Sequence, residues 1–166
     1  FQDLMRELPD VPIEMEVQES LKVELKVEGV GKFDLPGGDP IDFPELPKVD
    51  GKLSLKTSGG TVKRMINKTM FAVSKDEMRP ILTGFLLQLR PGEFRMVATD
   101  GHRLSRVTSR DVVYKGEAKD IVIPMKAFNI LVRNLADDDS PIFNFAETRP
   151  SFNTGDYTMI TRLIDG

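Results

Sequence analysis

Apolar and charged side chains alternate along residues 13–35, and this alternation constrains the fold more than any other feature of the sequence. In the second run, Lys22, Glu24 and Lys26 separate the apolar positions. A period of two is typical of antiparallel strands that have one face buried and the other in water. The pattern therefore predicts strands here, with a turn at 29–31 and a further strand from Lys32. The apolar positions of the first two runs are Ile13, Met15, Val17, Leu21, Val23, Leu25 and Val27.

Alternation returns further along the chain and predicts more strands, at 52–57, 81–89, 94–99 and 102–108, with shorter ones at 121–123, 142–146 and within 157–164. Pro91-Gly92 and Asp100-Gly101 lie between such runs and predict hairpin turns. Helical spacing of apolar residues predicts helices at 1–8, 62–74 and 125–136, with Thr61 as the N-cap of the second. Residues 36–47 are rich in Pro and Gly and predict a tether, with Phe43 and Leu46 packed on a sheet.

The first eight residues resemble residues 128–135 without a gap, because Phe, Leu, Arg and Leu recur at an offset of 127. The order of predicted elements after the two helices also matches. These features indicate a repeated domain, of which the chain holds the back part of one copy and most of the next. The second copy reads as strand, helix and strands twice over. It predicts an α+β fold of antiparallel sheets with two helices on one side.

Charge is distributed unevenly along the chain. Residues 1–50 carry five Lys/Arg and thirteen Asp/Glu, a net charge of −8, whereas residues 51–166 carry eighteen and thirteen, a net charge of +5. The segments 62–75 and 125–136 contain no acidic residue. Side by side, these helices would form a basic face that binds phosphates without reading sequence. The alternative is a solvated surface of uneven charge. The basic residues concerned are Lys63, Arg64, Lys68, Lys75, Lys126 and Arg133.

The sequence offers little for catalysis or metal binding. It has no cysteine, and His102 is its only histidine, so it cannot form a cysteine site or a two-histidine site. Asp137-Asp138-Asp139 lacks the spacing of a calcium loop and predicts a solvated loop. We therefore expect no cofactor, no metal and no catalytic residue. With no run of about 18 apolar residues, we also expect no membrane partner.

Two rival interpretations remain open at this point. One is a hydrolase site around Asp100 and His102, which would need a nucleophile held by the histidine and a third group that orients it. The other is a protein-interaction module that forms no ring and whose basic helices face solvent.

Several stretches of the chain resemble the beta sliding clamp family of bacterial DNA polymerase III. They are residues 42–47 (DFPELP), Phe71–Ser74 with Arg79–Gly84, residues 96–104 (MVATDGHRL) and residues 161–166. The resemblance implies a DNA-clamp fold, with antiparallel sheets outside and two helices per domain lining the inner face. It implies that residues 1–48 are the C-terminal half of a first domain, that residues 49–166 are a nearly complete second domain, and that a third domain is absent.

The resemblance also implies a function without catalysis. Members of the family are processivity factors that close as homodimeric rings around duplex DNA, without sequence specificity, and tether the replicative polymerase. The expected partners are double-stranded DNA, the DNA polymerase III alpha subunit, the clamp loader and other proteins that carry a clamp-binding motif. The expected cellular location is the cytoplasm, in association with the nucleoid.

Three sets of residues follow from this resemblance. The DNA-facing candidates are Arg6, Lys63, Arg64, Lys68, Lys126 and Arg133. The candidates for a groove that binds peptide motifs are Arg79, Leu82, Thr99, Gly101, His102, Arg103 and Leu104. Phe33 and Leu35 match an edge strand used between subunits. The missing third domain would supply the other side of the groove, so we expect this chain to bind peptides weakly. Pro80 and Ile81 stand where some members carry aromatic residues, which puts base stacking there in doubt.

Overall fold

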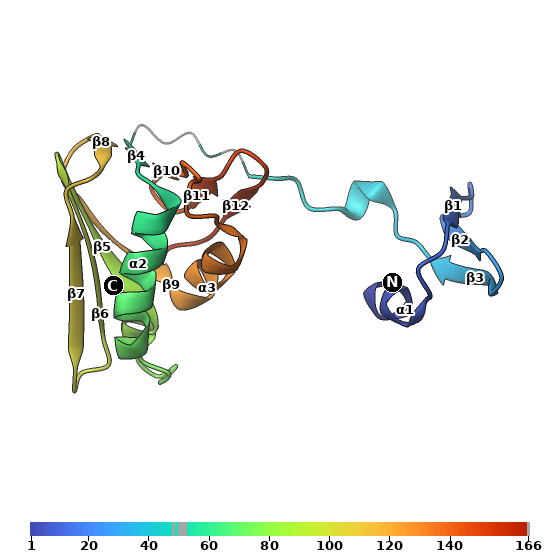
Figure 1. Ribbon diagram of the computed structural model, residues 1–166, viewed down its shortest axis with the longest axis horizontal. Coiled ribbons are helices and arrows are strands. Elements are labelled where there is room, and N and C mark those ends of the chain that lie inside the picture. Colours follow the sequence, from blue (N-terminus) through green and yellow to red (C-terminus); the bar gives the residue numbers. More distant parts are fainter. Residues whose placement is uncertain (48, 50–52, 166) are drawn as a thin grey trace. The chain divides into compact units, whose positions relative to one another are not determined.

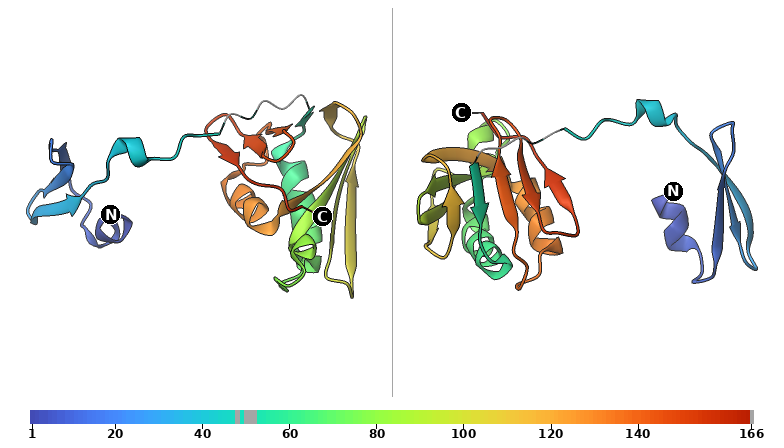
Figure 2. Two further views of the ribbon diagram at one scale, coloured as in Figure 1. Left: turned by 180° about the vertical axis from the view of Figure 1, so that it is seen from behind. Right: turned by 90° about the horizontal axis from the view of Figure 1, so that it is seen from above.

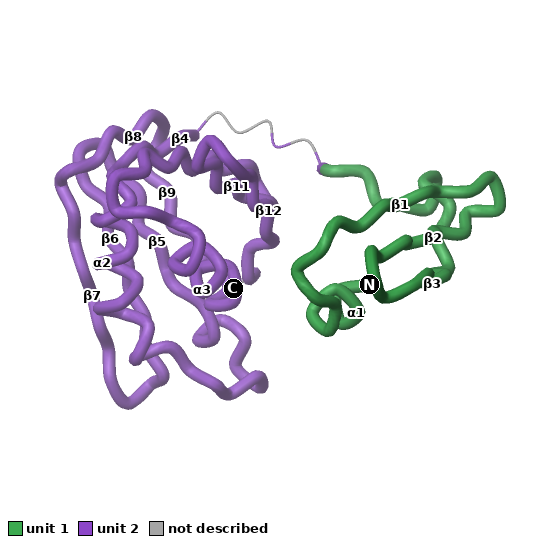
Figure 3. Tube along the Cα trace, turned by 45° about the vertical axis from the view of Figure 1, so that its right-hand side comes forward, with its two compact units in different colours: residues 1–46 green, residues 47–166 purple. Residues whose placement is uncertain are grey.

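The computed structural model describes residues 1–47, 49 and 53–165. Lys52, the first residue of one predicted strand, and Gly166, the last residue of the matching C-terminal stretch, lie outside this range. The chain divides into two compact units, Phe1–Leu46 (unit 1) and Pro47–Gly166 (unit 2), shown in different colours in Figure 3.

Unit 1 is a short helix followed by a three-stranded antiparallel sheet (Figure 1). The helix α1 spans Gln2–Glu7, and the strands are β1 (Ile13–Val17), β2 (Lys22–Val27) and β3 (Gly31–Pro36), in the order β1-β2-β3. The alternation places Leu25 and Val27 in the interior. Leu21 departs from the prediction, since its positive φ of 64° puts it in the turn before β2. The turn requires a residue in the left-handed backbone conformation at this position, and the alternation of apolar residues does not predict such a conformation.

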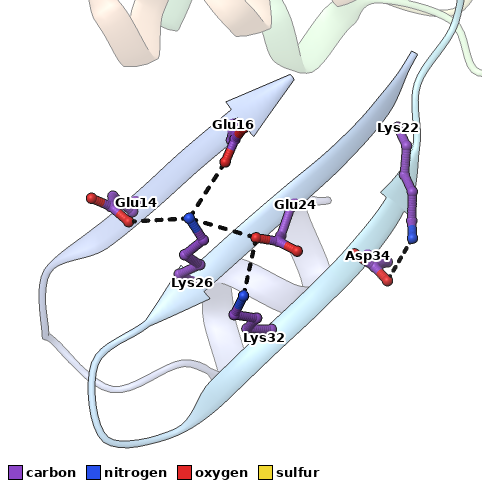
Figure 4. A network of polar contacts seen from close by, with 7 residues as sticks. All are labelled: Glu14, Glu16, Lys22, Glu24, Lys26, Lys32 and Asp34. Atoms are coloured by element: carbon purple, nitrogen blue, oxygen red, sulfur yellow. Dashed lines mark hydrogen bonds and ion pairs between the residues drawn. The ribbon is translucent and has the colours of Figure 1, made fainter. Parts of the chain in front are cut away.

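The outer face of this sheet carries a network of ion pairs (Figure 4). Like charges lie directly opposite each other at Glu16 and Glu24 and at Lys26 and Lys32. Lys26 Nζ lies 3.4 Å from Glu16 and 3.6 Å from both Glu14 and Glu24, so one ammonium group is shared by three carboxylates. The hydrogen bond to Glu16, followed by the charges of Glu16 and Glu14, raises the pKa of Lys26. The network thus offsets a cross-strand repulsion that would otherwise weaken the sheet.

The tether at residues 36–47 contains a short 3-10 helix, η1, at Pro40–Asp42. The Asp39 carboxylate accepts a hydrogen bond from the Ile41 N–H and so caps it. The prediction that Phe43 and Leu46 pack on a sheet is wrong for the sheet of unit 1. Their side chains are 76% and 83% exposed. Backbone bonds within the tether hold its shape, and the apolar side chains do not contribute to it.

Unit 2 contains two antiparallel sheets (Figures 1 and 2). The four-stranded sheet has the order β7-β6-β5-β9, and the five-stranded sheet has the order β12-β11-β10-β4-β8. The four-stranded sheet is formed by β5 (Gly84–Arg90), β6 (Glu93–Thr99), β7 (Leu104–Ser109) and β9 (Lys119–Pro124). The five-stranded sheet is formed by β4 (Leu53–Lys56), β8 (Val113–Lys115), β10 (Ile142–Phe145), β11 (Pro150–Asn153) and β12 (Thr158–Ile160). These elements confirm the predicted α+β class, although β8 and β11 were not predicted as separate strands.

Helix α2 spans Gly59–Thr69, so it begins and ends earlier than predicted. Ser58, not Thr61, is the N-cap, because its hydroxyl oxygen accepts a hydrogen bond from the Thr61 N–H at 3.2 Å. At the other end, the Thr69 hydroxyl donates to the Met65 carbonyl at 2.7 Å, and the chain continues as a 3-10 helix, η2, at Met70–Ala72. A hydroxyl that bonds back to the helix competes with the backbone ladder, which favours termination at this point.

Helix α3 spans Met125–Asn134, close to the prediction, and lies next to α2 and β9. The apolar stripes of both helices contribute to one core. It includes Val62, Met65 and Ile66 from α2 and Ala127, Phe128 and Leu131 from α3. None of the helices in the described ranges is long and apolar enough to cross a membrane.

The predicted repetition of elements is visible in the structure. Helix α1 is followed by the antiparallel strands β1, β2 and β3, and helix α3 is followed by the antiparallel strands β10, β11 and β12. Within unit 2, β4 and α2 precede β5, β6 and β7 just as β9 and α3 precede β10, β11 and β12. The fold therefore repeats one strand–helix–sheet motif.

Two adjacent glycines at the start of α2 give contrasting predictions. A Cβ on Gly59 would collide with the carbonyl oxygen of Ala136, whereas a Cβ on Gly60 would meet the Asp137 oxygen at an ordinary 3.5 Å. We expect Gly59→Ala to lower the free energy of unfolding by about 2 kcal/mol through overpacking. Gly60→Ala should leave it unchanged or raise it by up to about 1 kcal/mol, because alanine favours helices. Urea denaturation of both variants tests this, and equal losses would contradict the close approach at Gly59.

Candidate functional site

The two helices of unit 2 run in opposite directions. The Gly59 and Gly60 N–H groups donate to the Asp139 and Asp137 carbonyls, which places the start of α2 beside the end of α3. The end of α2 and the start of α3 meet at a shared pocket, lined by Met70 and Met125 among others. Both helices bury one stripe, so their charged residues lie on the stripe that faces away from the core.

The exposed stripes of this helix pair carry only positive charge. Arg64 and Lys68 on α2 and Lys126 and Arg133 on α3 are exposed. None of these four forms an ion pair with any residue in the described part of the chain. The structure thus brings four predicted DNA-facing residues onto one helix pair, where their charges are available to an external anion.

Lys63 has a different environment from these four residues. Its Nζ lies 2.6 Å from the Asp137 carboxylate, and its side chain is only 31% exposed. Lys75, counted in the sequence among the basic residues of the segment 62–75, lies beyond η2 in a loop. Arg6, the remaining DNA-facing candidate, is on α1 of unit 1 and lies 4.0 Å from Asp3.

The loop between β6 and β7 is organised by the Asp100 carboxylate. Its Oδ1 accepts hydrogen bonds from the N–H groups of His102 and Arg103, both at 3.0 Å, and its Oδ2 accepts one from Arg103 Nε at 3.0 Å. The Thr99 hydroxyl donates to the Arg103 carbonyl at 2.8 Å. Gly101 has a φ of +93°, which side chains with a Cβ rarely adopt. The predicted two-residue turn is therefore a four-residue loop with its own internal bonding.

This loop borders an open pocket of about 690 Å³ at the end of the helix pair. Arg79, His102 and Arg103 from the predicted groove line it, together with Lys75, Asn129 and Phe71. The Arg103 guanidinium lies 5.7 Å from the centre of the Phe71 ring, a cation–π distance. The Asp76 carboxylate accepts a hydrogen bond from Arg79 Nε at 2.9 Å, and this bond together with the Met78 N–H lowers the pKa of Asp76.

The other predicted groove residues lie outside this pocket. Leu104 begins β7 and is 64% exposed, and Leu82 is half-buried in the 3-10 helix η3 (Pro80–Thr83). Pro80 and Ile81 are exposed at the start of η3. In unit 1, Phe33 and Leu35 are half-buried on β3, which is an edge strand of its sheet.

The hydrolase hypothesis is not supported by the bonding around Asp100. The Asp100 carboxylate is engaged by two backbone N–H groups and by Arg103, and it meets His102 through the backbone. Ser105 has the hydroxyl side chain that follows His102 most closely in the sequence, and this hydroxyl donates to the Lys68 carbonyl at 2.6 Å. These residues therefore do not form the linked nucleophile, base and orienting group that catalysis needs.

Sequence reasoning missed three residues at this site: Phe71, Asp76 and Asp137. Asp76 stands three positions before Arg79, a local spacing that favours such a pair. Phe71 and Asp137 contact residues far away in the sequence, so no local pattern reveals their role.

The comparisons with known proteins agree with this fold. The chain aligns over 99% of its length with the DNA polymerase III subunit beta of Pseudomonas aeruginosa, with a TM-score of 0.87 and 30% identity. It aligns over 99% with the DNA polymerase sliding clamp of Bacillus subtilis, with a TM-score of 0.85 and 29% identity. The fold thus places the chain in the sliding-clamp class of proteins.

The chain belongs to the DNA polymerase III beta subunit family, whose central-domain model matches residues 56–166. The beta sliding clamp of Staphylococcus epidermidis is 34% identical over the whole chain, and that of Staphylococcus aureus is 33% identical. The chain spans 44% of the length of these two relatives, and 45% and 43% of the two solved structures.

The bonding of Asp100 predicts a carboxyl pKa below its ordinary value. The Arg103 N–H, then the His102 N–H, lower its pKa from the ordinary 3.8. The pKa of Asp100 is lower in the folded chain than in the unfolded chain. The ionised carboxylate therefore stabilises the fold fully at pH values above the unfolded pKa, and this stabilisation is lost as the pH falls through the folded pKa. A carbon-13 NMR titration should place the Asp100 midpoint below 3.8.

A matched variant separates the causes of this shift. Arg103→Ala removes the guanidinium but keeps both backbone N–H groups, so the Asp100 pKa should rise only part of the way toward 3.8. A midpoint at or above 3.8 in the unmodified chain would show that the loop is not held as described.

Proposed function

We propose that this chain forms part of a ring-shaped sliding clamp, the non-catalytic processivity factor of a bacterial replicative polymerase. The ring would be a homodimer of the full-length protein that encircles duplex DNA in the cytoplasm, at the nucleoid. Residues 1–48 would belong to the first domain and residues 49–166 to the second. A third domain would complete each subunit.

The observation that carries this proposal is the antiparallel helix pair whose exposed stripes bear only positive charge. Arg64, Lys68, Lys126 and Arg133 are exposed, and none is paired with a described residue. Exposed cations of this kind bind phosphates through counterion release, without reading sequence. Because each contact is weak and screened by salt, a protein held by such contacts moves along DNA. Family membership supports the same role.

The pocket beside the Asp100–Arg103 loop supports a second part of the proposal. We assign it as one side of a groove for short motifs of the polymerase alpha subunit, the clamp loader and other clamp-binding proteins. Arg79, His102 and Arg103 line the pocket, and Leu104 is exposed next to the loop. A third domain would supply the opposite wall. Phe33 and Leu35 on the edge strand β3 would form the contact between subunits, since an edge strand can pair with another chain.

Retention on circular DNA tests the ring. The full-length protein is loaded on a nicked circular plasmid with a clamp loader and ATP, and the plasmid is then linearised. A sliding ring should remain on the circle and be lost from the linear form. Retention that does not change on linearisation would mean ordinary binding, and no retention with an active loader would favour the interaction module that forms no ring.

Charge reversal tests the DNA-facing helices separately. Arg64→Glu, Lys68→Glu, Lys126→Glu and Arg133→Glu combined should abolish processive synthesis while the circular dichroism spectrum stays unchanged. Arg106→Glu is the matched control, because Arg106 is exposed on β7 opposite Val97, on the face away from the core. Unchanged synthesis in the fourfold variant would remove the DNA-facing assignment.

A further inference from the structure

Lys63 is the one predicted DNA-facing residue of unit 2 whose charge is already engaged within the described structure. Its Nζ lies 2.6 Å from the Asp137 Oδ1, a short charge-assisted contact. The Lys63 side chain is 31% exposed and the Asp137 side chain is 77% exposed, so the pair lies at the surface of the helix pair. Arg64, the next residue along α2, is exposed and forms no ion pair with any described residue.

Asp137 is held in place by the backbone around it. Its carbonyl oxygen accepts a hydrogen bond from the Gly60 N–H at 2.9 Å, and the neighbouring Asp139 carbonyl accepts one from the Gly59 N–H at 2.8 Å. The Asp139 carboxylate accepts a further bond from the Ala136 N–H at 2.7 Å. The loop is therefore fixed against the first turn of α2, where the helix dipole favours negative charge. Lys63 therefore lies within reach of the Asp137 carboxylate, whose backbone is held in place by the loop after α3.

We propose that Asp137 acts as an internal substitute for a DNA phosphate and keeps Lys63 from contributing to DNA binding. This inference rests on the proposed function. A phosphate that approaches Lys63 must displace a carboxylate that is tethered nearby, and an intramolecular competitor has a high effective concentration. The displaced carboxylate would also stay close to the phosphate and repel it. The basic face then exchanges counterions at Arg64, Lys68, Lys126 and Arg133 but not at Lys63.

The consequence is a lower affinity for DNA and a weaker dependence on salt. Each phosphate contact contributes about 0.9 to the slope of log K against log salt concentration. Removing the competitor should therefore add one contact and steepen the slope by about 0.9. Asp137 in this sense determines affinity: it limits how tightly the helix pair holds DNA and so favours movement along it.

The experiment uses the chain itself and a short DNA duplex, followed by NMR of lysine side chains. In the unmodified chain, the duplex should shift the Nζ signals of Lys68 and Lys126 but leave that of Lys63 unchanged. In Asp137→Asn, the Lys63 signal should shift as well, and the salt slope should steepen by about 0.9. Asp138→Asn is the matched control, because it removes the same charge from an exposed neighbour that forms no ion pair with a described residue.

Lys63→Gln provides a second test that leaves the loop carboxylates in place. In the unmodified background it should not change the salt slope, whereas in Asp137→Asn it should cancel the gain. An equal response of Lys63 to DNA in the unmodified chain and in Asp137→Asn would overturn this inference while Lys68 and Lys126 still respond. No response of Lys68 and Lys126 would overturn the DNA-facing assignment, and the inference with it.

Discussion

The side chain of Phe128 packs against both sheets of unit 2 and so connects them through one core. Its ring lies 5.1 Å from the Phe85 ring on β5 and 5.8 Å from the Phe152 ring on β11, in edge-to-face arrangements. Each sheet alone has one apolar face, which must be covered. Because a side chain of α3 contacts both sheets, the position of α3 is fixed relative to both. The polar surface of the helix pair depends on this shared core.

The arrangement of charge follows from that core. Helices α2 and α3 bury their apolar stripes in the core. Their basic residues therefore lie on the opposite, exposed stripes. The loop after α3 closes on the first turn of α2, which requires the absence of a side chain at Gly59. The same closure brings Asp137 to Lys63. The contact between the loop after α3 and the first turn of α2 therefore affects three features. It requires glycine at position 59, it gives hydrogen-bond acceptors to the first N–H groups of α2, and it pairs Lys63 with Asp137.

The loop at Asp100–Arg103 shows how hydrogen bonds can hold together a polar loop that is largely exposed. A single carboxylate accepts hydrogen bonds from two N–H groups and one guanidinium, and the guanidinium also lies near the ring of Phe71 on η2. The pocket is lined by residues of this loop, of the segment that follows α2 and of the start of α3. Local hydrogen bonds position Asp76, Arg79, Asp100 and Arg103 in its lining.

The sequence by itself determined the α+β class, the existence and approximate position of the long helices and most strands, and the absence of acidic residues on both helices of unit 2. Each of these follows from the local spacing or composition of residues along the chain. Only the tertiary structure decided that Asp137 forms an ion pair with Lys63 while Arg64 pairs with no described residue, that Arg103 reaches Phe71, and that Thr69 and Ser58 set the ends of α2. These contacts join segments far apart in the sequence or depend on which of several hydroxyls reaches the backbone, and no periodicity encodes such distances.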